Sequence, residues 1–175
     1  MTQTAPAATQ PSHTRRLALP VIIALIGYTL DQLSKNWVLS NMSEGETIPV
    51  LPPVLSWHFV RNPGAAFSMG TEYTWVFTII MVAVAGYVIY KLASTTHTIW
   101  LASLGALLGG ILGNLTDRLF QEPAFGLGHV IDFIAVPNFA VFNIADSLIV
   151  CSMIVICLLL IKGVTLTEQP ATQDA

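Results

Sequence analysis

Residues 129–150 read HVIDFIAVPNFAVFNIADSLIV, an apolar stretch that carries two carboxylates, Asp132 and Asp146. No lysine or arginine lies within the stretch to neutralise either charge. In one straight helix the two carboxylates would lie about 21 Å apart, too far to cooperate. Pro137 and Asn138 interrupt the segment, however, and a proline disfavours helix in the residue before it. The pattern therefore predicts a turn that returns the second carboxylate to the depth of the first.

The composition of the whole chain is typical of a polytopic membrane protein. Of its 175 residues, 54% are hydrophobic and only 10% are charged, which is too apolar for an ordinary soluble domain. The net charge of −3 is small and the few basic residues form no patch. We therefore expect membrane lipids as partners and no nucleic acid.

Four segments have about the 20 residues needed to cross a bilayer. We predict these spans at residues 17–39, 75–93, 99–120 and 141–161. The first segment follows two arginines and could be read as a secretory signal peptide. It continues through Tyr28 and Asp31 without a small-residue cleavage site, which favours an uncleaved helix.

The expected fold class is an all-α polytopic membrane protein with four transmembrane helices and a small extracytoplasmic β element. Residues 15–163 are expected to form a single catalytic domain. Residues 1–14 have the composition of a disordered cytoplasmic tail, and residues 164–175 are expected to form a second cytoplasmic tail.

Basic residues indicate the orientation of the spans. Arg15, Arg16, Lys91 and Lys162 all lie on one side of a four-span arrangement, which the positive-inside rule assigns to the cytoplasm. Both termini are then cytoplasmic, and the loops at residues 40–74 and 121–140 lie outside.

Polar residues gather near the outer ends of three spans, where a charge is costly unless it faces the bundle interior or a wet cavity. These residues are Asp31, Gln32, Ser34, Lys35, Asn114, Asp117, Arg118, Asn143 and Asp146. Asp31 and Lys35 are spaced i, i+4, and Asp117 adjoins Arg118, so these groups could simply neutralise one another locally. A structural and a functional role both remain open for them.

Asp132 and Asp146 have no such local partner. Two carboxylates a few ångströms apart do not both ionise readily, so one keeps a proton while the other is charged. The ionised group can take a proton from water, and the protonated group can donate to a carbonyl oxygen. Peptide hydrolysis at the membrane surface is therefore a candidate function, which the spacing of the two residues does not establish by itself.

Five sequence blocks occur in the order found in bacterial lipoprotein signal peptidase, also called signal peptidase II, which the chain resembles from the first span to the fourth. The blocks are DQLSK (31–35), RNPGAAFS (61–68), GNLTDR (113–118), VIDF (130–133) and FNIAD (142–146).

The resemblance implies an intramembrane aspartyl endopeptidase of the bacterial cytoplasmic membrane, with its active site near the extracytoplasmic face. Its substrate would be a prolipoprotein with a diacylglyceryl-modified cysteine, cleaved just before that cysteine. Asp132 and Asp146 match the catalytic aspartates. The implied polar supports are Asp31, Lys35, Asn62, Asn114, Arg118 and Asn143. We expect no metal ion or cofactor, and a monomer.

The resemblance is weakest between the third and fourth spans. Residues 119–131 form a longer segment than in many members of the family, so the shape of this outer loop is open. His129 lies in it, three residues before Asp132, and we leave it out of the site because an outer-loop histidine is more often a bystander.

Two further patterns have structural interpretations. Residues 55–60 (LSWHFV) have strand-forming composition, and residues 62–64 (NPG) are typical of a turn, so we predict a small sheet, with an ordered loop as the alternative. Gly105, Gly109 and Gly113 form a stripe that permits close helix packing.

Other functions fit less well. The chain has no HExxH and no GxSxG motif, and GLGHVID (126–132) has histidine where the GxGD motif of presenilin-like proteases has aspartate. A proton-coupled carrier would be expected to show repeated halves, which are not apparent. A non-catalytic four-span assembly factor would leave the two carboxylates unexplained.

Overall fold

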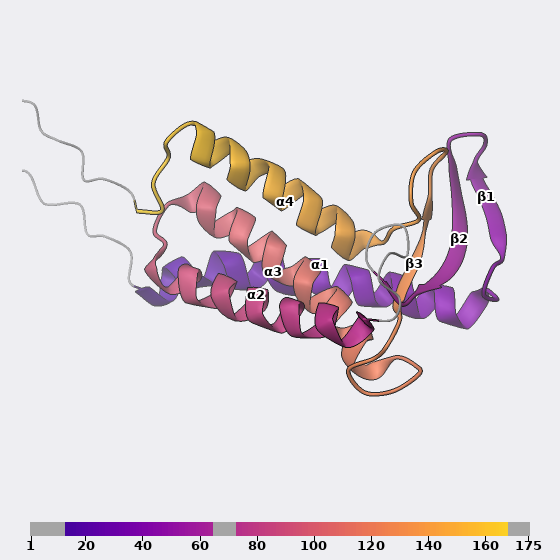
Figure 1. Ribbon diagram of the computed structural model, residues 1–175. Helices are drawn as coiled ribbons and strands as arrows, with labels where there is room; N and C mark the ends of the chain where they lie inside the picture. The colour runs from indigo at the N-terminus through magenta and orange to yellow at the C-terminus, as the bar shows by residue number, and fades with distance from the viewer. Residues whose placement is uncertain (1–12, 65–72, 168–175) are drawn as a thin grey trace, which may run out of the picture.

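The computed structural model describes residues 13–64 and 73–167, which form four long helices and three short strands (Figure 1). The helices are α1 (His13–Asn41), α2 (Thr74–Ser94), α3 (Thr98–Phe120) and α4 (Ile144–Ile161), and the strands are β1 (Thr47–Leu51), β2 (Leu55–Asn62) and β3 (Val130–Ala135). Each helix is long and apolar enough to cross a membrane, which confirms the predicted class of four-span membrane protein. Of the two expected tails, residues 1–12 and 168–175 lie outside the described part of the chain.

The central element of the bundle is α3, which packs against α1, α2 and α4. Within its most apolar window 67% of residues are buried, against 22% in each of the other three helices. A Cβ on Gly105 would lie 2.6 Å from the carbonyl oxygen of Pro20, and one on Gly109 would lie 2.7 Å from that of Ala24. The predicted glycine stripe is therefore where the backbone of α1 reaches that of α3.

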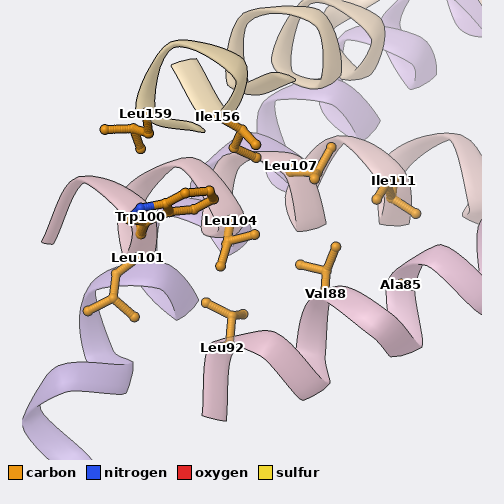
Figure 2. Close-up of a cluster of buried hydrophobic side chains, with 10 residues drawn as sticks. All are labelled: Ala85, Val88, Leu92, Trp100, Leu101, Leu104, Leu107, Ile111, Ile156 and Leu159. Carbon is orange, nitrogen blue, oxygen red and sulfur yellow. The ribbon is translucent and has the colours of Figure 1, made fainter. Parts of the chain in front are cut away.

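Ten buried apolar side chains from α2, α3 and α4 form the main core, in the half of the bundle away from the sheet (Figure 2). They are Ala85, Val88, Leu92, Trp100, Leu101, Leu104, Leu107, Ile111, Ile156 and Leu159. Among the described residues, no charged side chain is buried in this half, as expected where a helix crosses hydrocarbon.

The three strands form an antiparallel sheet of order β1-β2-β3 at one end of the bundle (Figure 1). The predicted sheet at residues 55–60 is confirmed as β2, whereas the sequence did not predict β1 or β3. Ile131 and Phe133 of β3 pack with Val38 of α1 in a second apolar cluster. Because side chains alternate along a strand, Asp132 between them faces the opposite side.

The predicted turn after β3 is present. Asn138 has a φ of 61°, a conformation that asparagine tolerates better than most residues. The chain then returns, and Phe142 forms a β-bridge with Ile134. Because this bridge uses Phe142, α4 begins at Ile144, three residues later than predicted.

A Schellman motif ends α4. The backbone N–H of Gly163, which has a φ of 67°, donates to the carbonyl of Leu160, and that of Val164 donates to the carbonyl of Leu159. The left-handed glycine turns the chain back across the end of the bundle, so that Val164 and Leu166 pack against the main core.

Candidate active site

Asp132 and Asp146 reach the same cavity from different elements. Asp132 lies on β3, and Asp146 lies in the first turn of α4. Both line a cavity of about 330 Å³ at the sheet end of the bundle. Asp132 is only 3% exposed, and Asp146 is half-buried. The turn between the two elements thus brings the carboxylates together, as the sequence predicted.

Each of the four oxygens of this acidic pair accepts a hydrogen bond from an amide N–H. The side-chain amides of Asn143 and Asn62 donate to Asp132 Oδ1 and Oδ2 at 2.7 Å and 2.8 Å. The Asn114 side chain donates to Asp146 Oδ1 at 2.7 Å, and the Asn143 backbone donates to Asp146 Oδ2 at 3.1 Å. Within residues 13–64 and 73–167, neither aspartate belongs to an ion pair. Neutral donors therefore hold both carboxylates.

Asn143 links the two carboxylates and also starts α4. Its side-chain oxygen accepts the Asp146 backbone N–H at 2.9 Å, which completes a capping box with the Asp146 carboxylate. Its side-chain amide donates to Asp132 and also, at 3.1 Å, to Asn114 Oδ1. The start of the helix and the positions of both carboxylates thus depend on one buried side chain.

A buried charged cluster lies behind the acidic pair. Lys35 Nζ lies 2.8 Å from the carboxylate of Asp31 and 2.8 Å from that of Asp117. It also donates to Asn114 Oδ1 at 2.9 Å. Because the oxygen of Asn114 faces the lysine, its N–H groups face the other way, toward Asp146. Lys35 therefore orients an amide that holds the acidic pair.

One of the two expected local pairings is confirmed and the other is wrong. Asp31 and Lys35 pair within α1, as their i, i+4 spacing indicated. Asp117 does not pair with the adjacent Arg118, because consecutive helical residues point in different directions. Its carboxylate contacts Lys35 and accepts the backbone N–H of Ile131 at 3.1 Å, so it joins α3 to α1 and β3.

Arg118 binds backbone carbonyls. Its Nη1 donates to the carbonyls of Pro63 and Gly128, each at 3.0 Å, and its Nη2 donates to that of Gly64. These carbonyls lie directly after β2 and directly before β3. Arg118 thus ties to α3 the loops that flank Asn62 and the strand of Asp132.

The pKa of the Asp132 carboxyl is raised from 3.8 to about 7, mainly by burial and next by the neighbouring charge of Asp146. The hydrogen bonds from Asn62 and Asn143 favour the ionised form and offset part of this shift. Asp132 can therefore gain or lose a proton near neutral pH.

His129 stays outside this network. Burial and the positive charges of Arg118 and Arg61 lower the pKa of its imidazole, so the ring is neutral at pH 7. His129 is not among the residues that line the cavity.

The structure joins all eight predicted site residues through direct or backbone-mediated contacts. They are Asp31, Lys35, Asn62, Asn114, Arg118, Asp132, Asn143 and Asp146. Sequence reasoning missed the role of Asp117. Its i, i+3 spacing from Asn114, which places both on one face of α3 toward Lys35, was the available signal. The described residues contain no group of three or more His, Cys, Asp or Glu side chains that could hold a metal ion.

Four spans, a sheet at one end and an acidic pair in the cavity at that end define a polytopic membrane protein with a candidate hydrolytic centre. The family model described as "Signal peptidase (SPase) II" matches residues 23–162. The chain therefore belongs to the signal peptidase II family, a family of proteases, and the resemblance read from its five sequence blocks is confirmed.

Relatives and solved structures agree with this assignment. The chain is 48% identical to the lipoprotein signal peptidase of Leifsonia xyli over 89% of its own length and 74% of that protein. It is 46% identical to the lipoprotein signal peptidase of Streptomyces coelicolor, over 85% and 73%. A solved structure described as a bacterial membrane enzyme superposes with a TM-score of 0.77 at 26% identity, covering 89% of this chain and 95% of that one.

Proposed function

We propose that this protein is an aspartyl endopeptidase that removes the signal peptide from diacylglyceryl-modified prolipoproteins, cleaving before the lipidated cysteine. The observation that carries this proposal is the acidic pair itself. Asp132 and Asp146 share one cavity, and each of their oxygens is held by a neutral amide donor. The names of the relatives, lipoprotein signal peptidases, support the choice of substrate.

The two aspartates have different environments, which suggests different roles. With its pKa near 7, Asp132 can hold the shared proton at neutral pH. Asp146 lies in the first turn of α4, where the helix dipole stabilises a negative charge. Asp146 is therefore the general base and Asp132 the general acid.

In the first step, Asp146 takes a proton from water as the water oxygen bonds to the scissile carbonyl carbon. Asp132 gives its proton to the carbonyl oxygen, which completes a neutral tetrahedral intermediate. In the second step the C–N bond breaks and the proton on Asp146 passes to the departing amine. One hydroxyl proton of the intermediate returns to Asp132, so the pair ends in its starting state.

The cavity has an apolar side that suits a lipidated substrate. Besides the acidic pair it is lined by Met81 of α2 and by Ile149 and Val150 of α4. A substrate with a signal helix and two acyl chains is held within the bilayer at the depth of such a surface. A peptide without the lipid lacks part of this attachment, so we expect it to be cleaved poorly.

The proposed location is the bacterial cytoplasmic membrane, with the sheet and acidic pair on the extracytoplasmic side and both termini in the cytoplasm. Lys91 and Lys162 lie at the helix ends remote from the sheet, which agrees with the positive-inside rule. A reporter active only outside the cytoplasm should be active when fused after Ser68 and inactive when fused after Ala93. The reverse pattern would contradict the proposed orientation.

We also propose that residues 15–163 act as one catalytic domain and that the working unit is a monomer. In support of a single domain, the hydrogen-bond donors to the acidic pair come from β2, from α3 and from the residue that caps α4.

The decisive experiment measures initial cleavage rates of a lipidated precursor by the purified protein in detergent. Asp132→Asn and Asp146→Asn should each lower the rate by at least about a thousandfold, because the amide cannot carry the transferred proton. Glu122→Gln, which alters an exposed carboxylate at the same end of the chain's bundle, should leave the rate unchanged. Substantial turnover by a folded Asp132→Asn or Asp146→Asn protein would contradict the aspartyl mechanism. Equal rates on lipidated and unlipidated precursors would contradict the proposed substrate.

A further inference from the structure

A second cavity, of about 750 Å³, lies in the half of the bundle away from the sheet. Its walls come from α2, α3 and α4, because α2 and α4 flank α3 (Figure 1). Val88, Leu104, Leu107 and Ile156 line it, and Figure 2 shows these side chains between the three helices. The cavity shares none of its lining residues with the one that holds the acidic pair.

The segment that follows α4 closes the end of this cavity. After the Schellman motif, the carbonyl of Val164 accepts the indole N–H of Trp100 at 3.0 Å. The carbonyl of Leu166 accepts the backbone N–H groups of Thr96 and His97 at 2.9 Å and 3.1 Å. Val164 and Leu166 are themselves lining residues. Val164 and Leu166 therefore line the end of the cavity, and apolar faces of α2, α3 and α4 line its length.

Lys91 is the charged side chain among the lining residues. Its Nζ lies 5.4 Å from the ring centroid of Tyr87 and 5.8 Å from that of Tyr90. Both tyrosines are exposed, as is usual for aromatic residues at the level of lipid headgroups. Lys91 thus lies between two aromatic rings and lines an apolar cavity near the end of the transmembrane bundle.

We propose that this cavity binds one acyl chain of an anionic phospholipid, whose phosphate pairs with Lys91. The two parts of the site match the two parts of a lipid. The apolar walls suit the acyl chain, and Lys91 lies at the level of the headgroup. Basic pockets between transmembrane helices are a known setting for anionic headgroups. The proposal does not depend on the reaction at the acidic pair.

A substrate signal helix fits this cavity less well. A transmembrane span needs about 20 residues, or about 30 Å of helix, whereas this cavity occupies one half of the bundle. The charged end of a signal peptide is also positive, so Lys91 would repel it. Charge complementarity therefore favours the lipid phosphate.

The test measures thermal unfolding of the purified full-length protein in neutral detergent while phospholipid is added. Phosphatidylglycerol should raise the unfolding temperature at lower mole fraction than phosphatidylcholine with the same acyl chains. Lys91→Gln should raise the half-saturating fraction of phosphatidylglycerol about fivefold. Lys162→Gln removes an exposed lysine near the same end that does not line the cavity, and should behave as the parent does.

A second pair of variants tests the apolar part of the site. Met153→Trp places a larger side chain in the wall of the cavity, and Ile154→Trp places the same side chain on a neighbouring face of α4 outside it. Only Met153→Trp should abolish the effect of phosphatidylglycerol, and both residues are exposed, so neither change disturbs the core.

Three results would overturn the proposal. Equal stabilisation by the two lipids would show that the headgroup charge does not matter. An equal effect of glycerol phosphate without acyl chains would show that the cavity does not matter. Loss of the lipid effect on adding a synthetic signal helix would assign the cavity to the substrate.

Discussion

Two groups of carboxylates lie next to each other at the sheet end of the bundle, and they are stabilised in different ways. In one group, Lys35 neutralises Asp31 and Asp117 through contacts of 2.8 Å each. In the other, the hydrogen bonds that Asp132 and Asp146 receive within residues 13–64 and 73–167 come from amide groups. The ion pairs with Lys35 fix the positions of the carboxylates in the first group. An amide donor can bind a carboxyl oxygen in either protonation state, so the second group is free to exchange protons.

Asn114 connects the two groups, since its oxygen accepts from Lys35 and its nitrogen donates to Asp146. The charged cluster therefore fixes the position of Asn114, and the acidic pair includes Asp132, which can exchange a proton near neutral pH. If this division is correct, changes to the first group should affect mainly stability, and changes to the second should affect mainly pH dependence and rate.

The largest expected effect on stability comes from Lys35→Met. It leaves two buried carboxylates without a cation and should lower the free energy of unfolding by about 3–5 kcal/mol. The triple variant Asp31→Asn, Lys35→Met, Asp117→Asn removes the charges together and should recover most of that loss. Unfolding temperatures in one detergent would compare them. If the triple variant is as unstable as the single one, the cluster contributes more than charge balance.

The next effect concerns pH and the raised pKa of Asp132. An aspartate whose pKa is raised from 3.8 to about 7 favours the folded state at low pH, and this contribution is lost as pH rises from about 4 to 7. The loss amounts to at most about 4 kcal/mol. Asp132→Asn should therefore flatten the dependence of the unfolding temperature on pH.

In the parent protein the cleavage rate should also fall as pH rises above about 7, because the shared proton is then lost. Parallel pH profiles of unfolding for the parent and Asp132→Asn, from pH 5 to 8, would check the first expectation. Identical slopes would mean that Asp132 does not titrate in this range.

Substitutions at Asn143 should separate the two roles of its side chain, which caps α4 and donates to Asp132. Asn143→Ala removes the helix cap, which should cost about 1 kcal/mol, and also removes the amide that holds Asp132. Asn143→Ser keeps a good capping oxygen but has no amide donor, so it should retain near-parent stability while losing as much activity as Asn143→Ala. Unfolding temperature and cleavage rate, measured on both variants, distinguish these effects. Parent-like activity of Asn143→Ser would indicate that the amide donor is dispensable.

The smallest effect is expected for His129→Gln. The imidazole is neutral at pH 7 and does not line the cavity, so the free energy of unfolding should change by less than about 0.5 kcal/mol. The pH profile of cleavage should keep its shape. A shifted profile would bring His129 into the titrating group and weaken the contrast drawn above.

The helices could be predicted from the sequence because a bilayer requires long apolar runs, and residues 75–93 and 99–120 each match an observed helix to within one residue at either end. The start of α4 could not be predicted in this way, because Phe142 is as apolar as the helix that follows it. It is excluded from α4 by its bridge to Ile134, a contact that depends on the turn between them. Strand β3 was missed for a related reason, since its partner β2 is distant in sequence. Strand β1 pairs with the neighbouring β2, but its sequence TIPVL contains a proline, which weakens the strand pattern.

The acidic pair could be predicted because an unneutralised carboxylate in an apolar segment is costly. Pro137 indicated a turn that returns Asp146 to the depth of Asp132. The partner of Asp117 could not be predicted from adjacency to Arg118. The sequence shows that Asp117 lies on the same helical face as Asn114, but only the packing of α1 on α3 places Lys35 against both. The partners of Arg118 could not be predicted either, because they are backbone carbonyls, which every residue type has.

The length of α4 has a consequence for the membrane around the protein. Its 18 residues span about 27 Å, slightly less than the roughly 30 Å of a typical hydrocarbon core. Asp146 lies in its first turn, and Lys162 follows its last residue. Hydrophobic mismatch is relieved by local thinning of the bilayer or by a shift of the short helix, at a fraction of a kcal/mol per ångström. A thicker host membrane would therefore immerse Asp146 more deeply, where its charge is costlier, so acyl-chain length in the surrounding lipid becomes a control on the ionisation of the site.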